Sequence, residues 1–224
     1  MIKIYEQMTQ GTDEWLAARR GILTASEMKH IITPSLKTAD NDKSRSHMYE
    51  LLAQRITEYV DPHYVSDDML RGHDDEIDAK ILYNTHFGAL HDVGFITNDQ
   101  WGFTIGFSPD ALVGEDGFIE VKGRRQKYQV ETIINNEMPS DYSIQVQTGM
   151  LVTGRKWCDF ISYSGGLPMS PIRVLPDYQV QEAIVRAATA FETRLAEKLA
   201  EYHAALKSRK FVETVRRVYE EISI

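Results

Sequence analysis

The residues best suited to chemistry are Asp110 and Glu120, which stand ten positions apart, and Lys122. They flank the turn signal at residues 114–117, so a hairpin would place the two carboxylates on adjacent strands, where opposing Cβ atoms lie about 5 Å apart. Two carboxylates and an ammonium suit a hard divalent cation and a water to be activated. The pattern predicts a metal-dependent hydrolytic site, although the spacing also fits a solvent-facing strand with a Glu120–Lys122 ion pair.

The turn length sets the expected register of this hairpin. With all four residues 114–117 in the loop, Asp110 would face Val121. Strand alternation then puts Glu120 and Lys122 on one face of the second strand and Val121 on the other, against the core. Ser108-Pro109 precedes Asp110, and the proline sets the aspartate at the end of a strand.

Further polar residues could complete such a site. Glu76 lies in the first turns of an expected helix, where it could be a metal ligand or a glutamate favoured by the helix dipole. Neighbouring Asp74 and Asp75 could equally supply the ligand. Gln145 and Gln147 share a later helix, and a glutamine on its core side could orient a water; exposure to solvent is the alternative.

An anion site is suggested by Arg19, Thr24 and Ser26. Residues 24–27 have the sequence of a capping box, which leaves backbone N–H groups free at a helix N-terminus where phosphate binds readily. Arg19 could add a bidentate contact. An ordinary helix cap would need no ligand.

The elements that must position these residues follow from hydrophobic spacing and turn signals. Strands mid-chain with helices before and after predict an α/β (α+β) domain with a central mixed sheet. The expected helices cover residues 13–20 (capped by Thr12), 24 onward, 47–58, 73–87, 139–152 and 177–206; the expected strands cover 101–107, 118–122, 157–163 and 172–175, with a polar loop at 35–46.

Bulk properties narrow the class of protein. The 224 residues fit one domain, with no apolar run long enough to cross a membrane. The single cysteine, Cys158, fits a reducing cytoplasm and is expected to be a buried strand residue. The net charge of −8 argues against a passive nucleic-acid coat. A basic strip nevertheless follows the hairpin and opposes an acidic stretch at 58–78, as a metal enzyme acting on a phosphate polymer requires; its members are Lys122, Arg124, Arg125 and Lys127.

Five blocks, in order, give the chain a specific resemblance over roughly residues 13–150. It resembles the lambda-type phage alkaline exonucleases, the phage-type viral recombinases of the PD-(D/E)xK nuclease superfamily. The resemblance implies a restriction-endonuclease-like core. The blocks are residues 15–27 (WLAARRGILTASE), 70–76 (LRGHDDE), 107–110 (FSPD), 119–122 (IEVK) and 144–147 (IQVQ).

The activity implied is a Mg²⁺-dependent 5′-to-3′ exonuclease on linear double-stranded DNA that releases 5′-mononucleotides and leaves 3′ single strands for recombination by annealing. Two Mg²⁺ are implied, with Mn²⁺ as a substitute, in a two-metal in-line hydrolysis. By the same resemblance the catalytic residues are Asp110, Glu120, Lys122, Glu76 and Gln147; the metal ligands are Asp110, Glu120, Glu76 and the Val121 carbonyl; the 5′-phosphate site is Arg19, Ser26 and Ser108; and the DNA contacts are Arg124, Arg125 and a wedge at Met69.

The resemblance also implies a toroidal homotrimer that encircles DNA, a single-strand annealing protein as partner, and the host cytoplasm as location. The chain is read as one nuclease domain, 1–224, with a C-terminal helical segment at about 177–222. Three alternatives stay open: a structure- or sequence-specific endonuclease on the same core, a non-catalytic DNA-end-binding recombination protein, and a small-molecule metal hydrolase.

Overall fold

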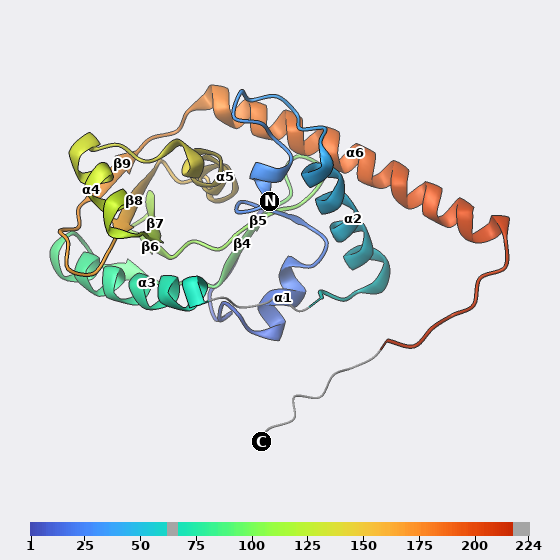
Figure 1. Cartoon of the computed structure of the whole chain (residues 1–224), viewed down its shortest axis with the longest axis horizontal. Helices are drawn as coiled ribbons and strands as arrows, with labels where there is room; N and C mark the ends of the chain where they lie inside the picture. Colours follow the sequence, from blue (N-terminus) through green and yellow to red (C-terminus); the bar gives the residue numbers. More distant parts are fainter. Residues whose placement is uncertain (62–66, 217–224) are drawn as a thin grey trace, which may run out of the picture.

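The computed structural model describes residues 1–61 and 67–216, the side chains of residues 67–69 excepted. Its strands form two sheets rather than the one central sheet that was expected (Figure 1). The first has the order β1 (Ile2–Tyr5), β4 (Phe95–Asn98), β5 (Ile105–Phe107), β2 (Leu23–Thr24); the second has the order β3 (Leu90–His91), β6 (Ala111–Val113), β7 (Gly117–Gly123), β8 (Trp157–Tyr163), β9 (Pro171–Val174).

Both sheets are mixed, which confirms the α/β class. In the second sheet β7 and β8 are parallel, and the remaining pairs are antiparallel. A parallel pair needs a crossover connection, and α4 and α5 supply it. The helices are α1 (Asp13–Arg19), α2 (Asp42–Thr57), α3 (Asp67–His86), α4 (Gln126–Asn135), α5 (Ser143–Thr153) and α6 (Tyr178–Ser208), with single 3₁₀ turns η1 (Met28–His30) and η2 (Ser140–Tyr142).

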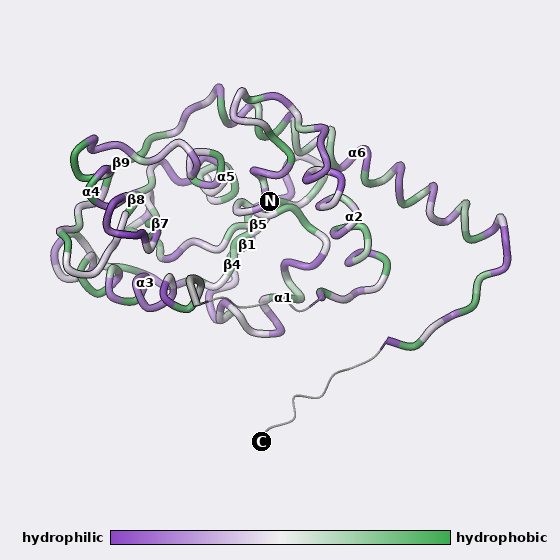
Figure 2. Tube along the Cα trace, viewed as in Figure 1, coloured by the Kyte–Doolittle hydropathy of each residue, from purple (hydrophilic) through white to green (hydrophobic). Residues whose placement is uncertain are grey.

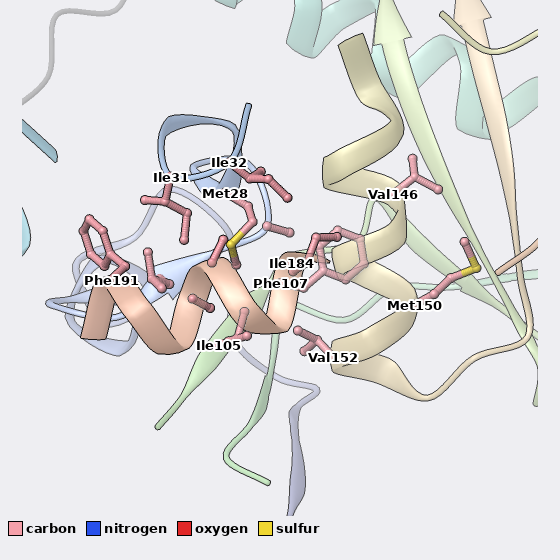
Figure 3. Packing of buried hydrophobic residues seen from close by; sticks show 14 of the residues in the cluster. Met28, Ile31, Ile32, Ile105, Phe107, Val146, Met150, Val152, Ile184 and Phe191 are labelled. Atoms are coloured by element: carbon pink, nitrogen blue, oxygen red, sulfur yellow. The ribbon is translucent and has the colours of Figure 1, made fainter. Parts of the chain in front are cut away.

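The main core lies between the first sheet, α5 and α6. Figure 3 shows Phe107 of β5 and Ile184 and Phe191 of α6 on one side of α5, and Val146 and Met150 projecting from its other side. All five belong to one buried cluster, which continues to Phe118 and Phe160 of the second sheet. All five side chains are at most 2% exposed. Burying an apolar side chain of this size contributes about 1.5–3 kcal/mol, so this cluster fixes α5 against the strands.

A second, smaller core lies under α3. Ala79 and Tyr83 of α3 pack on Ile119 and Val121 of β7 and on Ile161 of β8. Tyr83 also donates a buried hydrogen bond of 2.6 Å from its hydroxyl to a carboxylate oxygen of Asp159 on β8. This packing sets the distance of α3 from the strand that carries Glu120.

Most of the expected elements are present. Strand 157–163 is confirmed at both ends, and α1 is capped by Thr12, whose hydroxyl accepts from the N–H of Trp15. The prediction of a loop over residues 35–46 is wrong for its last five residues, because α2 begins at Asp42. Helix α4 and strand β4 were not anticipated.

The helix expected after Thr24 does not form. Leu23 and Thr24 pair with β5 as strand β2, and only one 3₁₀ turn follows. The Thr24 hydroxyl donates to Glu27 Oε2 at 2.5 Å, and the Glu27 N–H donates to the Thr24 carbonyl, so neither makes the side-chain-to-backbone hydrogen bonds of a capping box. Pairing with a buried strand therefore outweighs the capping signal.

Helix α6 begins as expected, because the Asp177 carboxylate accepts hydrogen bonds from the N–H groups of Gln179 and Val180. It ends at Ser208, however, and residues 209–216 are not helical, so a helical segment as far as 222 is wrong over that stretch. In Figure 1 the last turns of α6 run past α2, and the chain then turns back beneath it.

Candidate active site

A tight hairpin carries the two acids singled out first. β6 and β7 pair with Ala111 opposite Ile119 and Val113 opposite Gly117. The turn thus holds three residues instead of the expected four, and the register differs by one. Asp110 ends the connection into β6, where one of its carboxylate oxygens accepts a hydrogen bond from the backbone N–H of Val121.

Two residues at the start of β8 hold the turn of this hairpin in place: Arg155, just before the strand, and Trp157, its first residue. The Arg155 guanidinium donates to the carbonyl oxygens of Gly114 and Gly117 at 2.7 and 2.6 Å. The Trp157 ring lies so close to Gly117 that a Cβ there would sit 2.2 Å from the indole. The hairpin is therefore fixed before any ligand binds, which is what a precise site requires.

Glu120 is the most enclosed group of the site, with 1% of the residue exposed. Its Oε1 accepts a hydrogen bond of 2.6 Å from Gln145 Nε2 and lies 2.5 Å from Lys122 Nζ. Its Oε2 is buried with no hydrogen-bond partner among the described residues. A buried carboxylate oxygen left without a partner is costly, and a cation would satisfy it.

Burial and charge repulsion raise the pKa values of the acids in this site. Burial raises the pKa of Glu120 to about 7, with Lys122 opposing the rise and Asp110 contributing to it. Burial and the neighbouring Asp110 likewise raise the pKa of Glu76 on α3 to about 7. Burial favours the neutral amine of Lys122, but Glu120 and Asp110 outweigh it and raise its pKa. Such a cluster is typical of a functional site.

Asp110 and Glu76 open onto a cleft of about 770 Å³. Its walls include Trp15 of α1 and Lys80 of α3, and Lys80 forms an ion pair of 2.6 Å with Asp92. Glu120 and Lys122 lie behind Asp110 on β7. The structure therefore brings together four of the five expected catalytic residues.

These groups fit a hard divalent cation such as Mg²⁺. Among the described residues no three His, Cys, Asp or Glu side chains already form a ligand set. Mg²⁺ does not need one, because it keeps several waters and is bound through one or two carboxylates. Asp110 and Glu120 would supply these, since Glu120 has the unsatisfied Oε2.

The fifth expected catalytic residue, Gln147, does not lie with the other four. Its side chain is buried on the other side of α5, where Oε1 accepts from the N–H of Asp177 and Nε2 donates to the carbonyl of Leu175. Residues two apart on a helix point about 200° apart, so Gln145 and Gln147 cannot both face the carboxylates. Gln145 is the glutamine that faces the carboxylates, since its Nε2 donates to Glu120 Oε1. The sequence contains a feature that could have indicated this face of the helix. Gly149, four residues on, marks the face of α5 pressed against Phe107.

This correction gives a first prediction. Gln145→Ala should lower activity by about 10–100-fold, the range for residues that orient a ligand, with little change in Tm. Gln147→Ala should lower stability by about 1–3 kcal/mol, because it leaves the Asp177 N–H without its acceptor, with specific activity kept near that of the unaltered protein. Thermal unfolding and initial rates on linear duplex measure both; the reverse pattern would restore the original assignment of Gln147.

Two of the proposed anion residues, Arg19 and Thr24, line a hollow of about 140 Å³ next to the cleft, together with Glu27. The Arg19 guanidinium lies 4.2 Å from the Trp15 ring and donates to the Thr24 hydroxyl at 3.4 Å. That hydroxyl is 3.3 Å from the exposed Ser26 hydroxyl. Burial lowers the pKa of Arg19, against the opposing effect of Glu27. Arg19, Thr24 and Ser26 therefore lie close together as expected. They do so without the helix N-terminus that the sequence predicted at Thr24.

Trp15 joins this hollow to the cleft. Its indole N–H donates to the Ser108 hydroxyl at 2.9 Å, so Ser108 is tied to the wall shared by the two spaces. Trp15 lines both of them. The sequence reasoning gave Trp15 no role, although its place four residues before Arg19 on α1 puts both on one helix face.

Two of the proposed DNA contacts, Arg124 and Arg125, directly follow β7, the strand of Glu120 and Lys122; Lys122 and Arg124 lie 5.8 and 5.9 Å from the ring of Tyr142. Arg124 donates to the Thr132 hydroxyl at 2.8 Å and stacks over Tyr128, so it is engaged with α4. Arg125 is exposed at the start of α4. Met69 lies on α3, but its side chain is outside what the structure describes, so the wedge remains a prediction.

Comparison with known proteins bears on this site. The YqaJ-like viral recombinase domain matches residues 14–156. No curated protein matches the chain. An alkaline exonuclease from Laribacter hongkongensis, LHK-Exo, is similar in structure, with 30% identity and a TM-score of 0.77 over 88% of this chain and 98% of that one.

Two further structures are similar. LHK-Exo in complex with dAMP has 32% identity and a TM-score of 0.78 over 88% of this chain and 99% of that one. A phage-related exonuclease from Haemophilus somnus has 14% identity and a TM-score of 0.59 over 81% and 96%, a likeness of fold alone. No helix within the described residues is long and apolar enough to span a membrane.

Proposed function

The chain belongs to the YqaJ-like viral recombinase family and is a nuclease of the phage exonuclease type, and from this premise we propose that it digests linear double-stranded DNA from the 5′ end with Mg²⁺. One observation supports hydrolysis above the others. Glu120 is buried and held by Lys122 and Gln145, and its Oε2 has no hydrogen-bond partner within the described part of the chain. Asp110, the nearby acid of the same hairpin, lines the cleft.

The residues of the chain have distinct tasks in this reaction. Asp110 and Glu120 would hold the metal ions, with Glu76 and the Val121 carbonyl as further ligands. Bound Mg²⁺, with Mn²⁺ as a substitute, would supply positive charge for the attacking and leaving oxygens. Lys122 stays protonated and balances charge that develops on the phosphate. Gln145 fixes Glu120 Oε1, so the free Oε2 has one orientation.

The 5′-to-3′ polarity rests on the Arg19 hollow. A cation beside the Thr24 hydroxyl, which in turn contacts the Ser26 hydroxyl, suits a terminal phosphate. The guanidinium lies over Trp15, which also lines the cleft of Asp110 and Glu76. A strand end seated there would present its first phosphodiester to Asp110, so 5′-mononucleotides would be released and the other strand left single. A similar enzyme has been crystallised with dAMP, a mononucleotide.

Digestion of 5′-phosphorylated linear duplex, labelled at either end, tests this function. With Mg²⁺, a 5′ label should be released at once as a mononucleotide while a 3′ label is retained on long products. With EDTA, neither label should be released. Early release of the 3′ label would reverse the polarity, and undiminished digestion in EDTA would remove the metal from the proposal.

Arg19→Ala gives a second prediction. The variant should lose about 1.5–3 kcal/mol of phosphate binding, roughly a 10–150-fold slower start on 5′-phosphorylated ends, and should show little change on 5′-hydroxyl ends. Initial rates on two duplexes that differ only in this phosphate measure the effect. Equal losses on both ends would refute the phosphate site.

Assembly and partners are part of the same proposal. We infer a toroidal homotrimer around the duplex, with Arg124 and Arg125 toward the DNA, which would let a chain of net charge −8 act processively. The 3′ strands would pass to a single-strand annealing protein in the host cytoplasm.

A structure- or sequence-specific endonuclease is the nearest alternative, and closed circular duplex separates the two: an exonuclease leaves it intact. A non-catalytic end-binding protein is disfavoured by the carboxylate–lysine cluster, which DNA binding alone would not need.

A further inference from the structure

Three hollows follow one another across the surface through shared residues. Trp15 lines both the carboxylate cleft and the Arg19 hollow. Gln54, at the end of α2, lines both the Arg19 hollow and a third hollow of about 370 Å³. Val60, of the Arg19 hollow, lies between Tyr59 and Asp61, which line the third. The three hollows therefore adjoin one another in the order carboxylate cleft, Arg19 hollow, third hollow.

A basic segment of the chain ends at the third hollow. Residues 207–216, here called the basic arm, are all exposed and comprise the last two residues of α6 and the chain that follows it (Figure 1). The arm holds four basic side chains against one acid, Glu213, in a chain of net charge −8. Figure 2 shows hydrophilic and hydrophobic residues alternating along it. The basic members are Lys207, Arg209, Lys210 and Arg216.

Aromatic rings accompany these cations. The Arg216 guanidinium lies 3.8 Å from the Tyr59 ring, which brings the end of the arm to the wall of the third hollow. Arg209 lies 4.9 Å from the ring of Phe211, which is 46% exposed. Cations beside aromatic rings, here the exposed Phe211 and the half-buried Tyr59, are the combination that binds single-stranded nucleic acid, whose phosphates and bases are both accessible.

The order of the hollows indicates which strand would lie there. If the 5′-phosphate of the digested strand sits at Arg19, that strand ends there and does not continue toward the third hollow. The complementary strand has lost its partner at the same point and must leave nearby. We propose that the basic arm and the third hollow bind this uncut, 3′-ended strand as it emerges. The proposal rests on the proposed 5′-to-3′ exonuclease function.

The test compares DNA binding with and without the charges of the arm. Both proteins carry Asp110→Asn and are kept in EDTA, so that the DNA is not digested. The arm variant adds Arg209→Gln, Lys210→Gln and Arg216→Gln. Fluorescence anisotropy then measures affinity for a flush duplex and for a duplex with a 3′ overhang of about 12 nucleotides, a length within the range of single-strand sites.

With the arm intact, the overhang should bind more tightly than the flush end, and the arm variant should lose this preference. Three phosphate contacts on a single strand change the salt slope by about 2, so between 50 and 200 mM salt the intact arm should lose about 20-fold more affinity for the overhang than the variant does. A control with Lys29→Gln, Lys37→Gln and Lys43→Gln removes the same charge from exposed residues that line none of the three hollows. It should keep the preference.

Equal salt slopes for the arm variant and its parent on the overhang would overturn the proposal. So would a preference for a 5′ overhang, or a fall in oligomer mass by light scattering, which would assign the arm to contact with a second copy. Digestion by the unaltered protein separates the two proposals. If it releases no 5′ label, the function itself is wrong; if it does and the arm variant binds like its parent, only the role of the arm is wrong.

Discussion

Asp110→Asn is expected to lower duplex digestion by about 10³-fold or more while the protein stays folded and still binds DNA. Loss of a residue that only orients a ligand costs 10–100-fold, and loss of the ligand itself should cost more. Asparagine keeps an oxygen to accept the Val121 N–H, so the hairpin retains that hydrogen bond. Removing the negative charge of Asp110 also relieves the repulsion on Glu120 and Glu76.

Single-turnover digestion with Mg²⁺ measures the loss of rate, and fluorescence anisotropy on the same duplex measures the retained DNA binding. Asp92→Asn is a matched control. It removes a carboxylate from the rim of the same cleft, where Asp92 directly follows β3 and is paired with Lys80. That control should change the rate only slightly. Digestion by Asp110→Asn within tenfold of the unaltered rate would disprove a metal-ligand role for Asp110.

Lys122→Met is expected to lower the rate by about 10²–10³-fold, the cost of removing one charge that stabilises the transition state. Because nearby carboxylates raise the pKa of Lys122, this lysine is an ammonium at working pH and does not act as a free base. Lys122→Arg keeps the charge but not its compact shape, and should retain more activity than the methionine variant. Equal loss in both variants would show that positive charge at this position is not what matters.

The same variant has a pH signature in stability. Burial already raises the pKa of Glu120 to about 7, and loss of Lys122 removes the main effect that opposes this rise. A carboxyl whose folded pKa lies above its unfolded value makes the native state bind more protons, so stability falls as pH increases. Without metal, Lys122→Met should therefore lose more stability at pH 8.5 than at pH 6. A denaturant titration at each pH measures this, and equal losses would contradict the coupling.

The sequence predicts well what depends on local signals. Strand β8 is correct at both ends because its run of aromatic and β-branched residues stands between Gly154 and Gly165. Helix α6 begins where Asp177 can cap it. The acids at 110 and 120 are correctly placed together because a hairpin is a local structure.

The predictions from sequence fail where contacts with residues distant in the chain determine the structure. The capping box at Thr24 gives way to pairing with β5, which lies about 80 residues further along the chain. The choice between Gln145 and Gln147 depends on which face of α5 meets the sheet, and the resemblance supplied both glutamines without that orientation. The hairpin register differs by one because Arg155, far from the turn in sequence, closes a three-residue loop around its guanidinium.

The parallel pairing of β7 with β8 has a consequence for the order in which the protein assembles. During synthesis β7 can pair with β6 as soon as both have emerged, but its other edge stays open until the chain has been made as far as Tyr163. Until then the strand that bears Glu120 presents unpaired N–H and C=O groups to any other extended segment. Non-local parallel pairing is slow to form, so the interval in which nascent chains are most prone to mispairing coincides with synthesis of the α4–α5 crossover.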